Sequence, residues 1–409
     1  MSNKYKYLVL LGDGMADEAL AELDGKTPLM AASTPHLDEL AKKSELGTAL
    51  TVPEGFPAGS DVANLSVFGY SPQKYYTGRA PLEAANMGIE LGPDDVAFRC
   101  NLVNILHHQG RGFMHDFSAG HIPTAEAHEI IAALNQDLQS DELQFFPGIS
   151  YRHLLVIRDC PKELETLELM PPHDIIGQDI VDHLPGGYGL PLLQLITSSQ
   201  MIIHRMPKFR ERLDRGEVTA NSIWLWGQGK RPRLDPFAEL FGTSGAVISA
   251  VDLIKGIGVL AGMKIIEVPG ATGYLDTNYE NKAAYAVNAL KESDFVYLHV
   301  ESPDEASHEG SLEKKLQAIT DLDHRLLGPL LQGLEDNFPA YRILVMPDHP
   351  TPIRLKTHTS EPVPFMLYDN LKDAVGSPDG YNEKTATAAD NYFAEGWRLQ
   401  KHFTKDYRS

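Results

Sequence analysis

The sequence predicts an α/β fold in which a mostly parallel sheet is flanked by helices and carries a smaller inserted α+β domain. Two observations lead to this prediction. Strand-like and helix-like segments alternate up to about residue 95 and again from about residue 221, which is the order of a parallel sheet with crossover helices. From about Val96 the segments become short and are separated by turns. We therefore expect a core domain at residues 1–95 and 186–409 and an inserted domain at residues 96–185.

Length and composition limit the class of protein. The chain has 409 residues, of which 43% are hydrophobic and 22% are charged, and these values are typical of a globular protein with two domains. The formal net charge of -20 argues against nucleic-acid and anionic-membrane partners, since both require clustered Lys and Arg. Cys100 and Cys160 lack a zinc-ligand spacing and predict packed thiols in a reducing compartment. The N-terminus shows no signal-peptide pattern and no apolar run is long enough to cross a bilayer, so we expect a cytoplasmic protein.

The first strand-like segment runs from Tyr5 to Leu11 and ends abruptly at Gly12-Asp13-Gly14. In an open α/β sheet, ligands bind beyond the carboxyl ends of the strands, which is where Asp13 would lie. An Asp between two glycines is also a common turn former, so this motif alone leaves both interpretations open. The segment Thr34 to Lys43 then has a Pro at the first helical position and helical apolar spacing, which predicts a helix on the sheet.

The loop from Thr51 to Tyr70 contains the serine that we favour as a nucleophile. Pro and Gly residues give an irregular backbone up to Ser60, and Asp61 to Phe68 has the pattern of a helix. Ser60 would then be the N-cap of that helix, and capping alone is sufficient reason for a serine. The functional alternative is that the free N–H groups and the positive end of the helix dipole stabilise an alkoxide or a phosphoryl group there.

Candidate substrate-binding residues are scattered in and around the predicted insert. Arg79 lies in a Gly-bounded loop, where its planar guanidinium can clamp a phosphate or a carboxylate, although surface arginines are common. His115, Asp116 and Arg152 fall at turns or strand ends of the insert, and each alone is more often a surface or hydrogen-bonded residue than a ligand. Lys255 lies in a strand and helix unit of the core, near where a substrate can reach.

A strand predicted within Asp294 to Pro303 is followed by a carboxylate and an imidazole. If the next residues form a helical turn, the i, i+4 spacing places Asp304 and His308 on one face, as two metal ligands require. A surface hydrogen bond between the two side chains is the ordinary alternative.

The strand predicted at Ile343 to Met346 ends in a similar way. Asp348 and His349 follow it directly, and His358 follows after a Pro-rich loop. An Asp-His pair followed by Pro and Thr is also a good turn, so metal binding is one of two interpretations.

Three strands therefore deliver carboxylates to one predicted edge of the sheet, and three histidines accompany them. Carboxylate and imidazole ligands in this number can hold two divalent ions, and manganese, zinc and magnesium all suit such ligands. Two ions a few ångströms apart would activate Ser60 and clamp a transferring phosphoryl group. The six predicted ligands are Asp13, Asp304, His308, Asp348, His349 and His358.

Five separated motifs resemble a known family, in the same order: LGDGMAD, PAGSDVANLSVFGY, GRAPLEAA, SPDEASHEG, and PDHPTP with THTSEPVPF. Over nearly its whole length the chain is similar to the cofactor-independent phosphoglycerate mutases of archaeal type, in the alkaline phosphatase superfamily. The resemblance implies an alkaline-phosphatase-like core and a phosphoserine intermediate. It also implies interconversion of 3-phosphoglycerate and 2-phosphoglycerate in glycolysis and gluconeogenesis, independently of 2,3-bisphosphoglycerate.

The resemblance further implies roles for individual residues. One metal ion would be held by Asp13, Ser60, Asp348 and His349, and the other by Asp304, His308 and His358. Both would be divalent, with manganese favoured and magnesium, zinc and cobalt as alternatives. The insert would be a lid that binds the small phosphorylated substrate, and the candidates for that contact are Arg79, His115, Asp116, Arg152 and Lys255.

Other activities are alternatives at this point. Homoserine kinase-like phosphoryl transfer uses the same metal chemistry, and the motifs DEASHEG and DHPTPIRLKTHT resemble that branch as well. A metal-dependent phosphatase is a further enzyme hypothesis, and a metal-stabilised binding protein is a hypothesis from a different class. The residues that would separate these activities lie in the insert. The sequence leaves open the native metal, the extent of lid motion and whether the protein forms a homo-oligomer.

Overall fold

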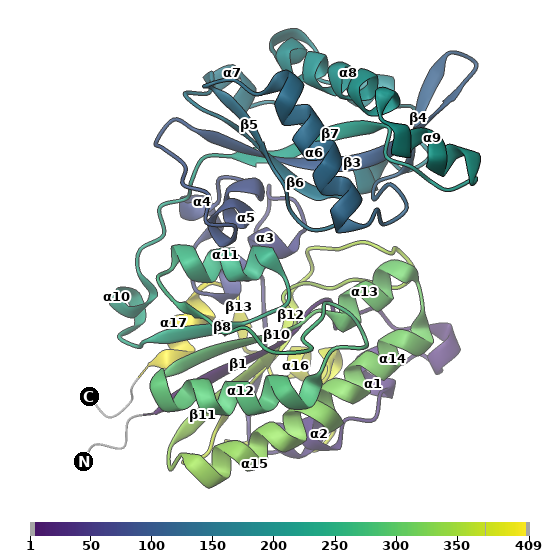
Figure 1. The fold of residues 1–409 in the computed structure, drawn as a ribbon. Coiled ribbons are helices and arrows are strands. Elements are labelled where there is room, and N and C mark those ends of the chain that lie inside the picture. Colours follow the sequence, from purple (N-terminus) through teal and green to yellow (C-terminus); the bar gives the residue numbers. More distant parts are fainter. Residues whose placement is uncertain (1–4, 373, 406–409) are drawn as a thin grey trace. The chain divides into compact units, whose positions relative to one another are not determined.

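The computed structural model describes residues 5–372 and 374–405, and the chain divides into two compact units (Figure 1). Unit 1 comprises Met1–Tyr76 and Arg233–Ser409, and unit 2 comprises Thr77–Pro232. Each unit contains one sheet with helices packed on it, which confirms the predicted α/β class. No helix among the described residues is both long enough and apolar enough to span a membrane.

Among the described residues, unit 1 contains an eight-stranded sheet. Strand β12 pairs antiparallel with both of its neighbours, β11 and β2. All other neighbouring strands pair in parallel, so the sheet is mostly parallel as predicted. In spatial order the strands are β13 (Tyr392–Phe393), β2 (Glu45–Ala49), β12 (Val363–Asp369), β11 (Tyr341–Met346), β1 (Lys6–Gly12), β10 (Phe295–Val300), β8 (Gly245–Ile248) and β9 (Lys264–Ile265).

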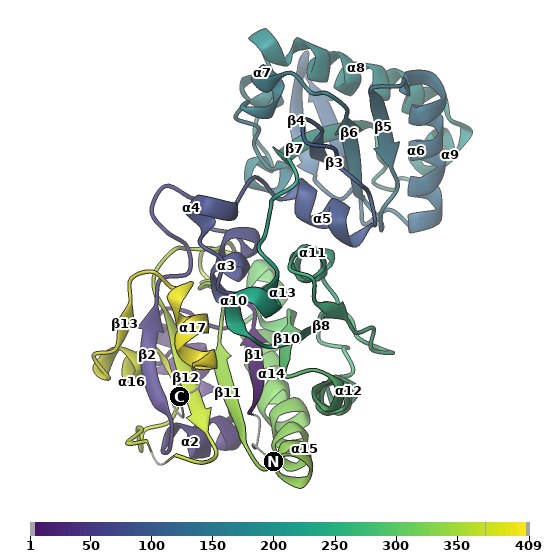
Figure 2. The ribbon, with the colours of Figure 1, turned by 90° about the vertical axis from the view of Figure 1, so that its left-hand side faces the viewer.

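The central strands β11, β1 and β10 are apolar and buried along almost their whole length, because helices cover both faces of a parallel sheet. On one face, α12 lies beside α15, and α14 runs end to end into α15 through a π-helical turn (Figures 1 and 2). The helices of unit 1 are η1 (Ala21–Leu23), α1 (Pro28–Ala31), α2 (Pro35–Ala41), α3 (Ser60–Val67), α4 (Pro72–Tyr75), α10 (Phe237–Phe241), α11 (Asp252–Leu260), α12 (Tyr279–Glu292), α13 (Ser302–Glu309), α14 (Leu312–Asp321), the π-helix η5 (Leu322–Leu327), α15 (Gly328–Asn337), α16 (Glu383–Ala388) and α17 (Arg398–Thr404).

Within the described residues, unit 2 contains a five-stranded antiparallel sheet. Its strands are β3 (Val96–His108), β4 (Arg111–Asp116), β5 (Leu143–Phe146), β6 (Arg152–Ile157) and β7 (Ser222–Gly229), and β3 pairs with β4, β6 and β7. Its helices are α5 (Ala80–Asn86), α6 (Thr124–Leu138), α7 (Lys162–Glu165), η2 (Pro172–Ile175), η3 (Ile180–His183), η4 (Gly187–Gly189), α8 (Leu190–Arg205) and α9 (Pro207–Asp214).

The two faces of strand β3 show why helices pack on both sides of this sheet. Phe98 and Cys100 point toward α6 and α8 and belong to one core cluster, in which Cys160 also lies as a buried free thiol. Ala97 points the other way and packs against Ala80 of α5. The alternation follows from the two-residue period of a strand.

The predicted insert, residues 96–185, is shorter than unit 2 at both ends. Strand β7, which falls in the predicted core segment 186–409, pairs with β3, and α8 packs on β7. Helix α5 packs on β3 as well. These contacts link segments far apart in the sequence, and an apolar strand pattern does not say which sheet the strand joins.

Two local features of the structure also bear on the sequence. Residues 190–214 form two helices, α8 and α9, because Pro207 cannot continue the hydrogen-bond ladder and holds Met206 in an extended conformation. Ser60 is the first residue of α3 rather than its N-cap, which is Gly59. The Ser60 hydroxyl is therefore available for another contact.

Candidate metal centre

Three adjacent strands of unit 1 carry the predicted ligands to one edge of the sheet. Strand β1 lies between β10 and β11, and its last residues pair with theirs, Gly12 with Val300 and Leu11 with Met346. The three strands end level with one another, so the segments that follow them leave the sheet at the same edge. Those segments carry Asp13, Asp304, His308, Asp348 and His349.

The first cluster consists of Asp13, Asp348 and His349, all buried, with potential ligand atoms within 4.8 Å of one another. The Nε2 atom of His349 lies 3.3 Å from Oδ2 of Asp348 and 3.6 Å from Oδ1 of Asp13. Asp348 is held by the backbone, because its Oδ1 atom accepts the N–H groups of Gly14 and His349 at 3.2 and 3.0 Å.

The buried Asp13 carboxylate lies beside other carboxylates, and its negative charge is not compensated by the described residues around it. Its Oδ1 atom is buried and has no hydrogen-bond partner among residues 5–372 and 374–405. Burial, followed by the charges of Asp348 and Asp304, raises the pKa of Asp13 well above its ordinary value. A bound cation would satisfy the orphaned oxygen and offset the repulsion between the carboxylates.

The second cluster consists of Asp304, His308 and His358. Helix α13 places Asp304 and His308 one turn apart on one face, as their i, i+4 spacing predicts, and Nε2 of His308 lies 3.0 Å from Oδ2 of Asp304. The Nε2 atoms of His308 and His358 face each other at 3.0 Å. Two imidazole nitrogens this close need a proton or a metal ion between them, because their lone pairs otherwise repel.

The second cluster holds a proton strongly in the absence of metal. Burial lowers the pKa of His308, but the charge of Asp304 and the hydrogen bonds to Asp304 and to the carbonyl of Lys356 outweigh it and raise the pKa to about 9. Burial by itself would raise the pKa of Asp304, but His308 and His358 hold that pKa well below its ordinary value. The ring centroids of His349 and His358 are 4.1 Å apart, so the two clusters adjoin.

Ser60 lies at this centre through its place in α3. Its Oγ atom is 3.1 Å from Nε2 of His349. Asn64, one turn further along α3, donates from Nδ2 to the carbonyl of Ser60 at 2.9 Å and to Oδ2 of Asp348 at 2.7 Å. The phenol of Tyr297 donates to Oδ1 of Asn64 at 2.6 Å, which fixes the orientation of the amide.

Sequence reasoning missed these supporting residues, although β10 contained a signal. Tyr297 and His299 are two polar side chains, two positions apart, in a strand that is otherwise apolar and buried. His299 contacts Oδ2 of Asp13 through Nε2 at 3.0 Å and Ser249 through Nδ1 at 3.2 Å. Burial lowers the pKa of His299 to about 3, so it is a neutral donor to Asp13. A buried histidine in a central strand is therefore worth testing as a support for a ligand.

Lys255 lies on α11 of unit 1 and is occupied by an ion pair. Its Nζ atom lies 2.8 and 2.9 Å from the two carboxylate oxygens of Glu267. The ammonium is mostly buried and Glu267 is mostly exposed.

In unit 2 the arginine candidates gather around one carboxylate. Glu83 is buried and accepts hydrogen bonds from Arg79, at 3.0 Å, and from Arg99. Both guanidinium groups lie over the ring of Trp226, and the charge of Arg152 also acts on Glu83. The structure thus brings Arg79 and Arg152 into one group and adds Arg99, a buried arginine that sequence reasoning did not select.

The other two candidates of unit 2 make local contacts. His115 lies 3.1 Å from Oδ1 of Asn104 through Nδ1. Asp116 accepts the backbone N–H and the hydroxyl of Ser118 at 2.7 and 2.6 Å. Burial raises the pKa of Asp116, but these hydrogen bonds outweigh it and lower the pKa overall. Asp116 is therefore a turn former in this structure.

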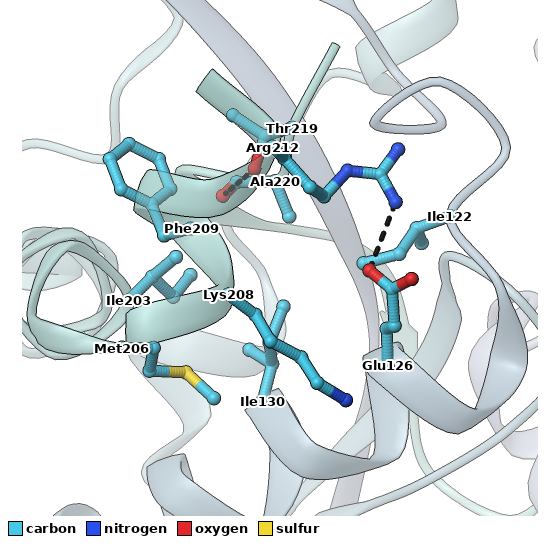
Figure 3. Close-up of a pocket in the computed structure, with 10 residues that line it drawn as sticks. All are labelled: Ile122, Glu126, Ile130, Ile203, Met206, Lys208, Phe209, Arg212, Thr219 and Ala220. Atoms are coloured by element: carbon cyan, nitrogen blue, oxygen red, sulfur yellow. Dashed lines mark hydrogen bonds and ion pairs between the residues drawn. The ribbon is translucent and has the colours of Figure 1, made fainter. Parts of the chain in front are cut away.

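A small cavity of about 20 Å³ lies elsewhere in unit 2, between α6, α8 and α9 (Figure 3). Most of the residues that line this cavity are apolar, and an ion pair of 2.9 Å between Arg212 and Glu126 lies at one side. The space is about that of one water molecule and includes none of the predicted site residues.

The fold and the site define a class, namely α/β proteins with a candidate two-metal centre beside a serine. Comparison with known proteins is more specific. A family model described as 2,3-bisphosphoglycerate-independent phosphoglycerate mutase matches residues 41–208. A protein of that name, marked probable, from Geobacter sulfurreducens is 56% identical over 97% of this chain and 98% of its own length. One from Methanosarcina barkeri is 53% identical over 93% of this chain and 94% of its own length.

Two solved structures are similar in fold. A Pyrococcus horikoshii protein is 26% identical with a TM-score of 0.79, over 99% of this chain and 100% of the other. A cofactor-independent phosphoglycerate mutase from Thermoplasma acidophilum, 24% identical with a TM-score of 0.60 over 98% and 100% of the two chains, shares the fold. The chain belongs to the 2,3-bisphosphoglycerate-independent phosphoglycerate mutase family, which confirms the resemblance seen in its motifs. The family implies divalent metal ions.

Proposed function

We propose that this protein is an isomerase that interconverts 3-phosphoglycerate and 2-phosphoglycerate in glycolysis and gluconeogenesis, independently of 2,3-bisphosphoglycerate. Family membership supports the reaction, and the relatives do not favour homoserine kinase or phosphatase activity. The single structural observation that carries the mechanism is the Oγ atom of Ser60, which lies 3.1 Å from Nε2 of His349 where the two clusters adjoin.

We assign one ion to the first cluster together with Ser60 and the other to the second cluster, with manganese favoured over magnesium, zinc and cobalt. The orphaned oxygen of Asp13 and the facing imidazoles of His308 and His358 fit this assignment. Bound divalent ions would supply positive charge and lower the pKa of the Ser60 hydroxyl. Asn64 meanwhile anchors the first turn of α3 to Asp348, which keeps Ser60 in place.

The proposed reaction conserves the phosphoryl group. Oγ of Ser60 loses its proton to a base and attacks phosphorus, the bond from phosphorus to the 3-oxygen of glycerate breaks as that oxygen takes a proton from an acid, and Ser60 becomes phosphoserine. The 2-hydroxyl of glycerate then attacks the same phosphorus and gives its proton to a base, and Ser60 is restored. Our candidates for that acid and base role are Lys255 and an Asp of the insert. Water must be kept away, because it would hydrolyse phosphoserine.

We assign recognition of the glycerate carboxylate and hydroxyls to unit 2, where the candidates are Arg79, Arg152, His115 and Asp116. The convergence of Arg79 and Arg152 on Glu83 supports this assignment, because several guanidinium groups around one carboxylate leave net positive charge for an anion. The two buried free cysteines and the net charge of -20 support a cytoplasmic protein without nucleic-acid or membrane partners.

The phosphoserine intermediate is the most direct test. We expect intact-mass measurement of the manganese-loaded protein with 3-phosphoglycerate to show one added phosphoryl group, and 2-phosphoglycerate to form without 2,3-bisphosphoglycerate. Ser60→Ala should lose both signals, with activity lower by at least about 10⁴-fold, as when a nucleophile is removed. Ser66→Ala is the matched control, since Ser66 is a buried serine of the same helix that bonds only a backbone carbonyl among the described residues. Mutase activity retained by Ser60→Ala would refute the phosphoenzyme route, and release of inorganic phosphate as the main product would favour a phosphatase.

A further inference from the structure

The hydroxyl of Thr351 lies between the two clusters and contacts one ligand of each. Thr351 is fully buried and lies in the loop that follows β11. Its Oγ1 atom donates to Oδ1 of Asp304 at 2.6 Å, and Nδ1 of His349 lies 3.2 Å from the same Oγ1. Asp304 belongs to the second cluster and His349 to the first, so one side chain joins them.

The Thr351 hydroxyl has one proton, and the neighbour that receives it determines which nitrogen of His349 is protonated. A ligating carboxylate is deprotonated and only accepts hydrogen bonds, so Asp304 takes the proton of the Thr351 hydroxyl. Oγ1 must then accept from His349, which requires the proton of the imidazole to sit on Nδ1. The reverse tautomer would use the hydroxyl proton for His349 and leave two oxygen lone pairs facing each other at 2.6 Å.

The tautomer determines what His349 offers to the first cluster. With the proton on Nδ1, the Nε2 atom accepts the hydroxyl proton of Ser60 at 3.1 Å and can bind a metal ion together with Asp348, whose Oδ2 atom lies 3.3 Å away. With the proton on Nε2, the nitrogen could bind neither a metal ion nor the hydroxyl proton of Ser60. A partner on the second nitrogen is the usual device by which proteins orient a ligating histidine.

The backbone holds this arrangement in place. Thr351 donates its N–H to the carbonyl of Ala16 and accepts at its own carbonyl from the buried ammonium of Lys315, at 3.1 and 2.9 Å. Gly14 closes the remaining side, because a Cβ atom there would lie 2.5 Å from both Oδ1 of Asp304 and Oγ1 of Thr351. A residue with a side chain at position 14 would therefore collide with this hydrogen bond.

We propose that Thr351 is a positioning residue that fixes the tautomer of His349 through Asp304 and thereby couples the two halves of the metal centre. If the Asp304 carboxylate no longer accepts the Thr351 proton, the tautomer of His349 in the first cluster is no longer fixed. The inference rests on the proposed metal centre, but its first readout is taken in metal-free protein and without substrate, so it can fail or succeed independently of the mutase reaction.

The test compares Thr351→Val, which keeps the shape and removes the hydroxyl, with Thr351→Ser, which restores it. In ¹⁵N-histidine-labelled, metal-free protein, with His349→Gln used to assign the signals, we expect the wild-type protein and Thr351→Ser to show the proton of His349 on Nδ1. Thr351→Val should show a mixture of tautomers. Calorimetric titration with Mn²⁺ should show affinity at the first cluster about tenfold lower in Thr351→Val, as for the loss of a partner that orients a ligand.

Thr404→Val is the matched control, because Thr404 is a buried threonine of α17 whose hydroxyl bonds the carbonyl of Gln400 at 2.9 Å. It should lose stability without changing the His349 tautomer or the Mn²⁺ affinity. The proposal is overturned if Thr351→Val behaves like this control, with stability lowered but tautomer and affinity kept. If Thr351→Val does not fold, Thr351→Ala removes the same hydroxyl with less bulk and carries the same expectations.

Discussion

Asp13 shows how a single residue can be unfavourable for folding and still be a proposed metal ligand. Its carboxylate is buried beside Asp348 and Asp304 and has an orphaned oxygen. Its pKa is raised in the folded state, so the charged form costs stability wherever the unfolded chain would be ionised, which is above the ordinary pKa of 3.8. At neutral pH the metal-free protein therefore bears this cost.

We predict that Asp13→Asn stabilises the metal-free protein, because the neutral amide removes a buried charge beside Asp348 and Asp304, while abolishing Mn²⁺ binding at the first cluster. Urea unfolding after chelation measures the first effect and calorimetric titration the second. Asp323→Asn is the control with the opposite sign, because Asp323 is equally buried and accepts hydrogen bonds from His36 and Leu37, which its substitution would weaken. A loss of stability in Asp13→Asn would contradict the prediction.

His308 should make the metal-free protein sensitive to pH. Its folded-state pKa of about 9 lies above its ordinary value of 6.5. The protonated form therefore stabilises the fold fully below pH 6.5, and this contribution is lost as pH rises through about 9. We predict that the difference in unfolding free energy between wild-type protein and His308→Gln, measured after chelation, is larger at pH 6 than at pH 9.5. A difference that is constant with pH would show that His308 is not held protonated by Asp304.

At the scale of elements, the turn after β1 depends on Gly14. Its φ of +60° is a left-handed conformation that residues with a side chain rarely adopt, and a Cβ atom would lie 2.5 Å from Asp304. Gly14→Ala therefore combines backbone strain with a collision in the metal centre.

We predict that Gly14→Ala loses about 1–2 kcal/mol from strain alone and more from the collision, and that it also lowers Mn²⁺ affinity. Gly25→Ala separates the two causes, because Gly25 has a φ of +79° but open space where its Cβ would lie. Thermal unfolding and Mn²⁺ titration of both variants are the measurements. Equal losses in both, with Mn²⁺ affinity unchanged, would mean that the turn tolerates a side chain.

At the scale of the whole molecule, all seven proposed ligands belong to unit 1. Mn²⁺ should therefore stabilise unit 1 in particular. We predict that adding Mn²⁺ to metal-free protein slows hydrogen exchange in residues 12–17, 301–308 and 347–359, and leaves residues 77–232 unchanged, because unit 2 contributes no ligand. Exchange followed by mass spectrometry measures this for each segment. Protection of equal size in unit 2 would place a metal site or a metal-dependent contact there.

The sequence by itself determined the α/β class and the ligand types at strand ends, because both depend on local patterns. The apolar runs of β1, β10 and β11 predicted buried strands that end at one edge of a parallel sheet, and the i, i+4 spacing of Asp304 and His308 predicted their common face. The motifs around these residues were also sufficient to suggest the family.

Only the tertiary structure decided which sheet β7 joins, what Ser60 contacts and which residues support the ligands. The sequence left Ser60 either as a helix cap or as a nucleophile, and the tertiary structure brings its Oγ to His349, which lies 289 positions away in the chain. Tyr297, Asn64 and Thr351 act through hydrogen bonds between segments distant in sequence. No periodic sequence pattern encodes such contacts, because they depend on how separate secondary-structure elements pack against one another.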